Sequence, residues 1–259
     1  MRHCYVVRVF TDGQSAGNPL GVIPGSVELS TEAMQGIATK LGFSETVFID
    51  WTAVGPPALR IFTPVAELPF AGHPLVGTAW VLNSMGPGVD RMSIPIGEVG
   101  IRMDNGACWV SPPETDQPVN TVSQDDVRKL GITVERAWRA EMPMDFLLAE
   151  LADGEAIDQA DPDIAAVKDA CDGFYVFARG EPARARFFAP RLGIDEDPAT
   201  GSAAVALAAV LRDEGQASGR LDILQGPPGS LSRVMVAWDG LRVELGGTVV
   251  HDEVRLLED

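Results

Sequence analysis

Two segments of the chain are apolar at almost every position and have the length of short helices. They cover residues 74–83 and 202–212, and glycine follows each of them. A helix that is apolar on all sides has to be enclosed by other elements. A third helix, with polar positions that place it outside, is predicted for residues 30–41, because Ser30 is a good N-cap and Gly42 a good C-cap.

The segments around the two apolar helices alternate between apolar and polar residues, which is typical of strands. The clearest examples lie near Tyr5, Thr46, Ala58 and Arg184. Asn105-Gly106 and Asp239-Gly240 are favoured two-residue hairpin turns. We therefore expect an α+β protein in which a curved sheet wraps around each apolar helix.

The sequence repeats itself at an offset of half its length. Seven of the sixteen residues from Glu67 to Leu82 are identical to those 129 positions later, and the motif Arg-x-Phe-x-Pro precedes both copies. A duplicated segment of this kind predicts two similar halves. We expect them to span residues 1–115 and 116–259, joined by the polar, proline-rich residues 112–123. The last predicted strand, near residues 249–256, is a candidate to cross back and pair with the first half.

The chain of 259 residues carries 37 acidic and 20 basic side chains, which gives a formal net charge of −17. The resulting field repels nucleic acids and anionic membrane surfaces, so we expect neither as a partner. No segment approaches the roughly 18 apolar residues of a membrane span, and no cleavable leader is evident, which favours the cytoplasm. An anionic small substrate would need a locally favourable site, such as a helix N-terminus.

Residues that usually bind metals or form disulfides are few and scattered. The three cysteines contain no Cys-x-x-Cys motif, and none of the three histidines has a second histidine or cysteine at ligand spacing. We therefore expect no disulfide framework and no metal site. Reduced thiols buried in the core are expected at Cys4, Cys108 and Cys171.

The loops that lead into the two apolar helices carry the most informative polar residues. Gly72-His73 begins the first helix, and Gly201-Ser202 begins the second. Glycine lets a ligand approach the backbone, and the N–H groups of a first helical turn attract anions. The two N-termini would then bind one carboxylate together across a cleft. The alternative is that both glycines only allow strand and helix to pack closely.

Three side chains are candidates for chemistry. Glu45 precedes the apolar residues 46–49, so it is either a desolvated base with a raised pKa or an exposed edge residue. His73 either orients a substrate or is a structural histidine. Asp197 belongs to the substrate site or only forms an Asp-Pro turn before the second helix. Asn18, between glycine and proline, is typical of a turn.

Four segments, in this order along the chain, resemble the signature blocks of the PhzF-like family. They are GNPLGVI (residues 17–23), SETVFI (44–49), RIFTPVAELPFAGHPLVGTA (60–79) and RFFAPRLGIDEDPATGSAAVALA (186–208). The resemblance implies a diaminopimelate epimerase-like fold, in which two barrel-like halves each surround a central helix and the active site lies between them. It also suggests a homodimer.

The resemblance further implies roles for single residues. Glu45 would transfer the proton, with His73 and Asp197 assisting. The substrate carboxylate would be bound by Gly72, Gly201 and Ser202. In the family's best-known member the reaction is the isomerisation of trans-2,3-dihydro-3-hydroxyanthranilate, which uses no metal, nucleotide or flavin.

Three functions fit these residues. The first is an isomerase that moves a proton on a small carboxylic acid through Glu45. The second is an epimerase in which Glu45 and Asp197 serve opposite faces of one carbon. The third is a small-acid binding protein that has lost turnover. A racemase with two thiol bases is excluded, because the helix-start loops carry Ala71-Gly72-His73 and residues 198–200, without cysteine.

Overall fold

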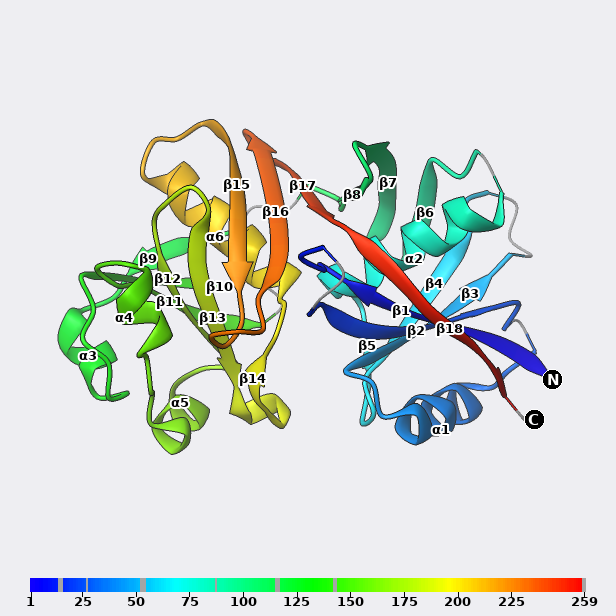
Figure 1. The fold of residues 1–259 in the computed structure, drawn as a ribbon, viewed down its shortest axis with the longest axis horizontal. Coiled ribbons are helices and arrows are strands. Elements are labelled where there is room, and N and C mark those ends of the chain that lie inside the picture. Colours follow the sequence, from blue (N-terminus) through cyan, green and yellow to red (C-terminus); the bar gives the residue numbers. More distant parts are fainter. Residues whose placement is uncertain are drawn as a thin grey trace. The chain divides into compact units, whose positions relative to one another are not determined.

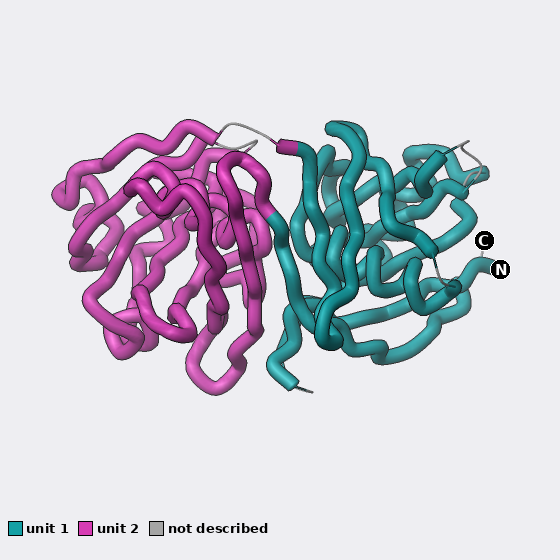
Figure 2. Tube along the Cα trace, turned by 90° about the horizontal axis from the view of Figure 1, so that it is seen from above, with its two compact units in different colours: residues 1–113, 244–259 teal, residues 114–243 magenta. Residues whose placement is uncertain are grey.

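The computed structural model describes residues 1–13, 16–26, 28–51, 55–86, 88–114, 117–141 and 144–257. The chain divides into two compact units, which Figure 2 colours separately. Unit 1 comprises Met1–Pro113 and Glu244–Asp259, and unit 2 comprises Glu114–Val243. Each unit is built from a strongly curved sheet and one buried helix (Figure 1).

Unit 1 contains one curved sheet with the strand order β18-β1-β2-β3-β4-β6-β7-β8-β17. The pairs β2–β3 and β4–β6 are parallel, the other pairs are antiparallel, and the short β5 adds to β4. The strands are β1 (Arg2–Val9), β2 (Asn18–Pro24), β3 (Glu45–Asp50), β4 (Ala58–Phe62), β5 (Glu67–Leu68), β6 (Arg91–Ile94), β7 (Gly97–Asp104), β8 (Ala107–Ser111), β17 (Arg242–Gly247) and β18 (Val249–Leu257).

The described residues of unit 1 include two helices. The helix α1 (Thr31–Leu41) has Ser30 and Gly42 as its caps, as predicted, and buries only Met34 and Ala38. The helix α2 (Gly72–Met85) contacts strands β1, β2, β3 and β8, and Ala79 at its centre is fully buried. The apolar segment is thus an enclosed helix, two residues longer at each end than predicted.

Unit 2 repeats this plan with the buried helix α6 (Gly201–Asp213), in which Ala208 is fully buried. The strands are β9 (Val119–Thr121), β10 (Arg136–Glu141), β11 (Asp145–Glu150), β12 (Gly173–Ala178), β13 (Ala183–Ala189), β14 (Ile194–Asp197), β15 (Ser218–Gln225) and β16 (Ser232–Asp239). The short helices are α3 (Gln124–Arg128), α4 (Gly154–Asp158), α5 (Ile164–Ala170) and the 3₁₀ turn η1 (Pro190–Leu192).

The two units share one pattern of strand pairing. In unit 1, β1–β2 is antiparallel, β2–β3 parallel and β3–β4 antiparallel, and β4 then pairs with antiparallel β5 and parallel β6. In unit 2 the same relations join β10, β11, β12, β13, β14 and β15. The register defines equivalent residues: Phe62 opposes Thr46, and its equivalent Phe188 opposes Phe174.

The two units do not correspond to a single cut of the chain, because the C-terminal residues from Glu244 onward belong to unit 1. The boundary expected between residues 115 and 116 lies outside the described residues. Within the segment expected to be a linker, Val119–Thr121 forms β9 and pairs with β10. The last strand, β18, pairs along its whole length with β1, from Arg2 with Leu257 to Val9 with Val249. No helix among the described residues has the length and apolar character of a membrane span.

Candidate active site

Glu45 is the first residue of β3 and is paired with Leu20 of β2. Its side chain is 16% exposed. Burial raises the pKa of Glu45 to about 7, and the nearby Ser44 side chain opposes this rise with a smaller effect. A carboxyl group with a pKa near neutrality can take up and release a proton under ordinary conditions.

His73 is the second residue of α2, and its side chain is 5% exposed. Its Nδ1 atom lies 3.4 Å from the Oε2 atom of Glu45. Gly77, one helical turn further on, explains the closeness of helix and sheet. A Cβ atom at this position would lie 2.5 Å from Leu20 Cδ2 and 2.7 Å from Val9 Cγ2. The missing side chain therefore lets α2 approach the strands that hold Glu45.

Asn18 and Ser44 also belong to the surroundings of Glu45. Asn18 is the first residue of β2 and 2% exposed, so the turn expected from its sequence context is wrong. The Ser44 hydroxyl donates a hydrogen bond of 3.0 Å to Asn18 Oδ1. This contact fixes the residue directly before Glu45 to the neighbouring strand.

Unit 2 holds a second cluster of buried polar groups. Asp197 ends β14 and is 9% exposed. Its Oδ2 atom accepts a hydrogen bond of 2.5 Å from the Thr200 hydroxyl. The side-chain amide of Gln225, at the end of β15, donates to Asp197 O over 3.1 Å and to Thr200 Oγ1 over 2.9 Å. Sequence reasoning missed Gln225, whose only signal is a lone amide at the end of a strand.

The two central helices begin differently from the other α-helices. The N-caps of α2 and α6 are Ala71 and Thr200, and neither side chain makes a capping hydrogen bond. The other four α-helices in the described part of the chain have side-chain caps, formed by Ser30, Ser123, Asp153 and Asp163. The backbone N–H groups at Gly72 and at Gly201-Ser202 therefore belong to helix starts suited to an anion.

The shared register shows that the two units carry different chemical groups. The position equivalent to Glu45 is Gly173, since Leu20 opposes Glu45 and Phe146 opposes Gly173. A Cβ atom on Gly173 would lie 2.3 Å from Phe187 Cζ, so this position has no room for a side chain. A carboxylate at this place in the fold therefore exists in unit 1 alone.

The loops before both helices are held by equivalent ion pairs. Arg60 contacts Glu67 through two hydrogen bonds of 2.7 and 2.6 Å. Arg186 contacts Glu196 through two of 2.8 Å. Each guanidinium also lies over the ring two residues later, Phe62 or Phe188, at 5.1 and 5.0 Å. The duplicated Arg-x-Phe motif thus fixes the short strand that leads into each helix start.

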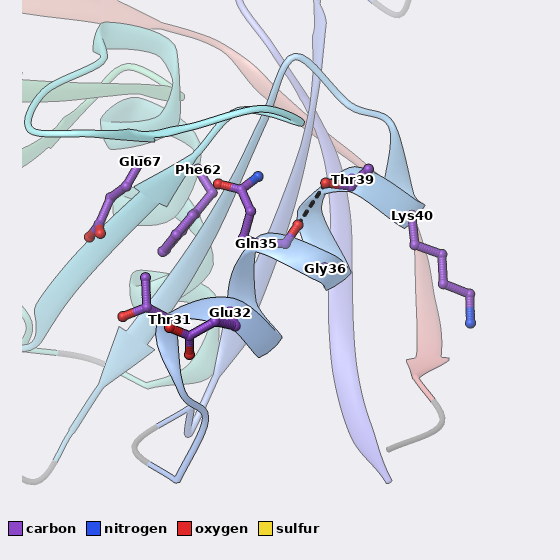
Figure 3. Close-up of a pocket in the computed structure, with 8 residues that line it drawn as sticks. All are labelled: Thr31, Glu32, Gln35, Gly36, Thr39, Lys40, Phe62 and Glu67. Atoms are coloured by element: carbon purple, nitrogen blue, oxygen red, sulfur yellow. Dashed lines mark hydrogen bonds between the residues drawn. The ribbon is translucent and has the colours of Figure 1, made fainter.

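A depression of about 660 Å³ on the outside of unit 1 contains none of the predicted site residues. Figure 3 shows that it lies along α1, with Phe62 and Glu67 on the other side. The Thr39 hydroxyl donates to Gln35 O, and Glu67 is bound to Arg60. None of the residues that line this depression is a buried ionisable group, so we do not assign the active site to it.

The three cysteine thiols are not paired in disulfides. Burial raises the pKa of the Cys4 thiol to about 11, of Cys108 to about 12 and of Cys171 to about 11. All three are free and buried, as expected. Among the described residues, no group of three or more His, Cys, Asp and Glu side chains is arranged to hold a metal ion.

Comparisons with known proteins agree with this architecture. The family model for phenazine biosynthesis-like proteins (PhzC-PhzF) matches residues 7–250. The trans-2,3-dihydro-3-hydroxyanthranilate isomerase of Pseudomonas chlororaphis is 33% identical over 243 residues, which are 87% of this chain and 86% of that protein. An uncharacterised isomerase of Pseudomonas aeruginosa is 32% identical over 212 residues, 79% of either chain.

Solved structures give the same result. The crystal structure of a PhzF family protein from Enterococcus faecalis is 26% identical, has a TM-score of 0.83 and covers 98% of this chain and 97% of that one. A probable proline racemase from Agrobacterium radiobacter shares the fold at 11% identity, with a TM-score of 0.68 over 100% of this chain and 93% of that one. The predicted diaminopimelate epimerase-like fold is confirmed, and the chain is an isomerase that belongs to the PhzC-PhzF family of phenazine biosynthesis-like proteins.

Proposed function

We propose that this isomerase moves a proton between two carbons of a small carboxylic acid, with Glu45 as both base and acid. The observation that carries the proposal is the buried carboxyl group of Glu45, whose pKa of about 7 suits proton transfer near neutral pH. Its equivalent in unit 2 is a glycine that cannot be replaced without a clash. A single carboxylate at this position fits a reaction in which one group removes and returns the proton.

The substrate carboxylate, in this proposal, binds to the N-termini of α2 and α6 at Gly72, Gly201 and Ser202. The first-turn N–H groups carry partial positive charge and offset the repulsion expected from a chain with a net charge of −17. The lack of side-chain caps on these two helices supports this role. His73 and Asp197 would orient and polarise the substrate.

A relative that is 33% identical is named trans-2,3-dihydro-3-hydroxyanthranilate isomerase, which supports a substrate of this class and makes that compound the first one to test. The purified protein is incubated with it in D₂O and the product is followed by proton NMR. We expect the double bonds to shift while part of the original hydrogen is retained, because a shielded Glu45 returns the proton before complete exchange. No conversion of this compound would contradict the proposed substrate.

The same spectra distinguish the epimerase alternative, in which Glu45 and Asp197 act on opposite faces of one carbon. That mechanism predicts deuterium at a stereocentre with every double bond in its original place. Migration of a double bond would rule it out for this compound.

We further propose that the reaction needs no cofactor and that the protein is a cytoplasmic homodimer. The proposed proton transfer requires only a group that accepts a proton and returns it, and the carboxyl group of Glu45 can do both. Turnover should survive exhaustive dialysis against a chelator. Sedimentation should give a mass of twice the 27.6 kDa of one chain, and a fluorescent fusion should distribute through the cytoplasm.

A further inference from the structure

The cluster around Asp197 contains two side chains to which the proposed mechanism gives no part. Thr200 and Gln225 are 9% and 0% exposed, and both hydrogen-bond to Asp197. The Oε1 atom of Gln225 is buried and has no hydrogen-bond partner among the described residues. Burying a polar atom in this way costs stability, so the fold alone gives no reason for an amide here.

The hydrogen-bond directions within the cluster are determined by chemistry. Asp197 O is a carbonyl and can only accept, so the Gln225 atom next to it must be Nε2. The same nitrogen donates its second hydrogen to Thr200 Oγ1. The Thr200 hydroxyl is therefore left to donate its own hydrogen to Asp197 Oδ2. Gln225 thus sets the direction of the hydroxyl, and the hydroxyl holds the carboxyl group.

The other copy of the repeat provides an internal comparison. Leu68 is the equivalent of Asp197, because Leu68 opposes Ile61 in unit 1 as Asp197 opposes Phe187 in unit 2. Ala71 is the equivalent of Thr200, because each of them is the N-cap of the central helix of its unit. Ala58 opposes Ser93 as Arg184 opposes Leu224, so Gln225, the residue after Leu224, is equivalent to Ile94. All three equivalents are apolar, in a unit with the same strand pairing. The fold therefore forms without this polar triad.

We propose that Thr200 and Gln225 are positioning residues, which hold the Asp197 carboxyl group in one orientation for the reaction. The inference rests on the proposed function, in which Asp197 assists proton transfer. Gln225 acts through Thr200 and through the backbone of Asp197, and Thr200 acts on the carboxyl group directly. Neither side chain has to touch the substrate.

The experiment measures kcat and KM with trans-2,3-dihydro-3-hydroxyanthranilate for Thr200→Val, Thr200→Ser, Gln225→Leu and Asp197→Asn. Thr200→Val should lower kcat about tenfold to a hundredfold, the scale of one hydrogen bond to a charged group. Gln225→Leu, which acts through Thr200 and the backbone, should also lower kcat, by no more than Thr200→Val does. Thr200→Ser keeps the hydroxyl and should restore most of the rate. The double variant Thr200→Val/Asp197→Asn should be no slower than Asp197→Asn alone, because Thr200 acts through that carboxylate.

A matched control is the triple variant Asp197→Leu/Thr200→Ala/Gln225→Ile, which installs the residues of unit 1. It should fold with a cooperative unfolding transition and turn over no faster than Asp197→Asn. Failure of this variant to fold, or additive losses in the double variant, would overturn the positioning role and make the triad structural. If Asp197→Asn itself keeps its full rate, the role of Asp197 in the proposed function fails. Loss of rate in Asp197→Asn with normal rates in Thr200→Val and Gln225→Leu would overturn only the present inference.

Discussion

The Nδ1 atom of His73 lies 3.4 Å from the Oε2 atom of Glu45, so an imidazole and a buried carboxyl group share one corner of unit 1. The two residues come from the start of a strand and the start of a helix, 28 positions apart in the sequence. An acid with a pKa of about 7 beside a histidine is an arrangement in which protons can be exchanged near neutral pH.

The first prediction concerns the pH dependence of the rate. A general base has to be ionised before it can remove a proton, and burial raises the pKa of Glu45 to about 7. We therefore expect kcat/KM to rise with pH and to level off above about 7. A profile measured from pH 5 to 9 checks this. An activity already constant from pH 5 upward would contradict an essential base with this pKa.

The second prediction concerns stability and needs no substrate. The pKa of Glu45 is about 7 in the folded protein against an ordinary value of 4.5, so stability is lost as the pH rises between these values. Glu45→Gln removes the buried charge. The unfolding free energy of Glu45→Gln minus that of the wild type should increase between pH 4.5 and pH 7.5, by up to about 3 kcal/mol. Urea denaturation at both pH values measures it.

Glu67→Gln is the matched control with the opposite sign. The Arg60 guanidinium holds the pKa of Glu67 below its usual value, so this carboxylate stabilises the fold at neutral pH and loses the effect as the pH falls. Glu67→Gln should therefore be less stable than the wild type at pH 7, with the difference shrinking in acid. Equal pH trends for the two variants would contradict the buried state of Glu45.

The third prediction tests how α2 positions His73. Gly77→Ala puts a methyl group within 2.5 Å of Leu20 and should push the helix away from the sheet. We expect a loss of about 1 to 3 kcal/mol in unfolding free energy, together with a lower kcat. Gly36→Ala in the exposed helix α1 meets no atom within 4 Å and should stabilise by up to about 1 kcal/mol without changing the rate. A fully active Gly77→Ala would show that the close approach is not needed.

The fourth prediction concerns the thiols. Their raised pKa values keep them protonated and poorly nucleophilic at neutral pH. Replacing each with alanine should leave kcat unchanged while lowering the unfolding free energy by about 1 kcal/mol. The sites are Cys4, Cys108 and Cys171. A folded variant without turnover would bring a thiol mechanism back.

Much of the fold could be predicted from the sequence, because its strongest signals are local. The two helices are apolar on every face, and the repeat has no gap from Glu67 to Leu82, so the sequence predicts both central helices with nearly correct bounds. Ser30 and Gly42 marked α1 for the same reason. The sequence predicts the turn after β16 at Asp239-Gly240, one residue before residues 240 and 241, which form it in the structure.

The remaining parts of the site depend on contacts between distant segments. Gln225 lies 25 residues from Thr200, and Asn18 lies 26 residues from Ser44, with no local pattern that links them. The equivalence of Glu45 and Gly173 is hidden because the offset there is 128 residues instead of 129 and the side chains share nothing. Only strand register makes these relationships visible.

The most direct test of the account is the turnover of Glu45→Gln with trans-2,3-dihydro-3-hydroxyanthranilate, measured beside the wild type under identical conditions. The amide keeps the shape of the side chain and cannot accept the proton. We predict a folded protein that has lost at least about two orders of magnitude in kcat. Near-normal turnover by folded Glu45→Gln would contradict the assignment of the proton transfer to Glu45.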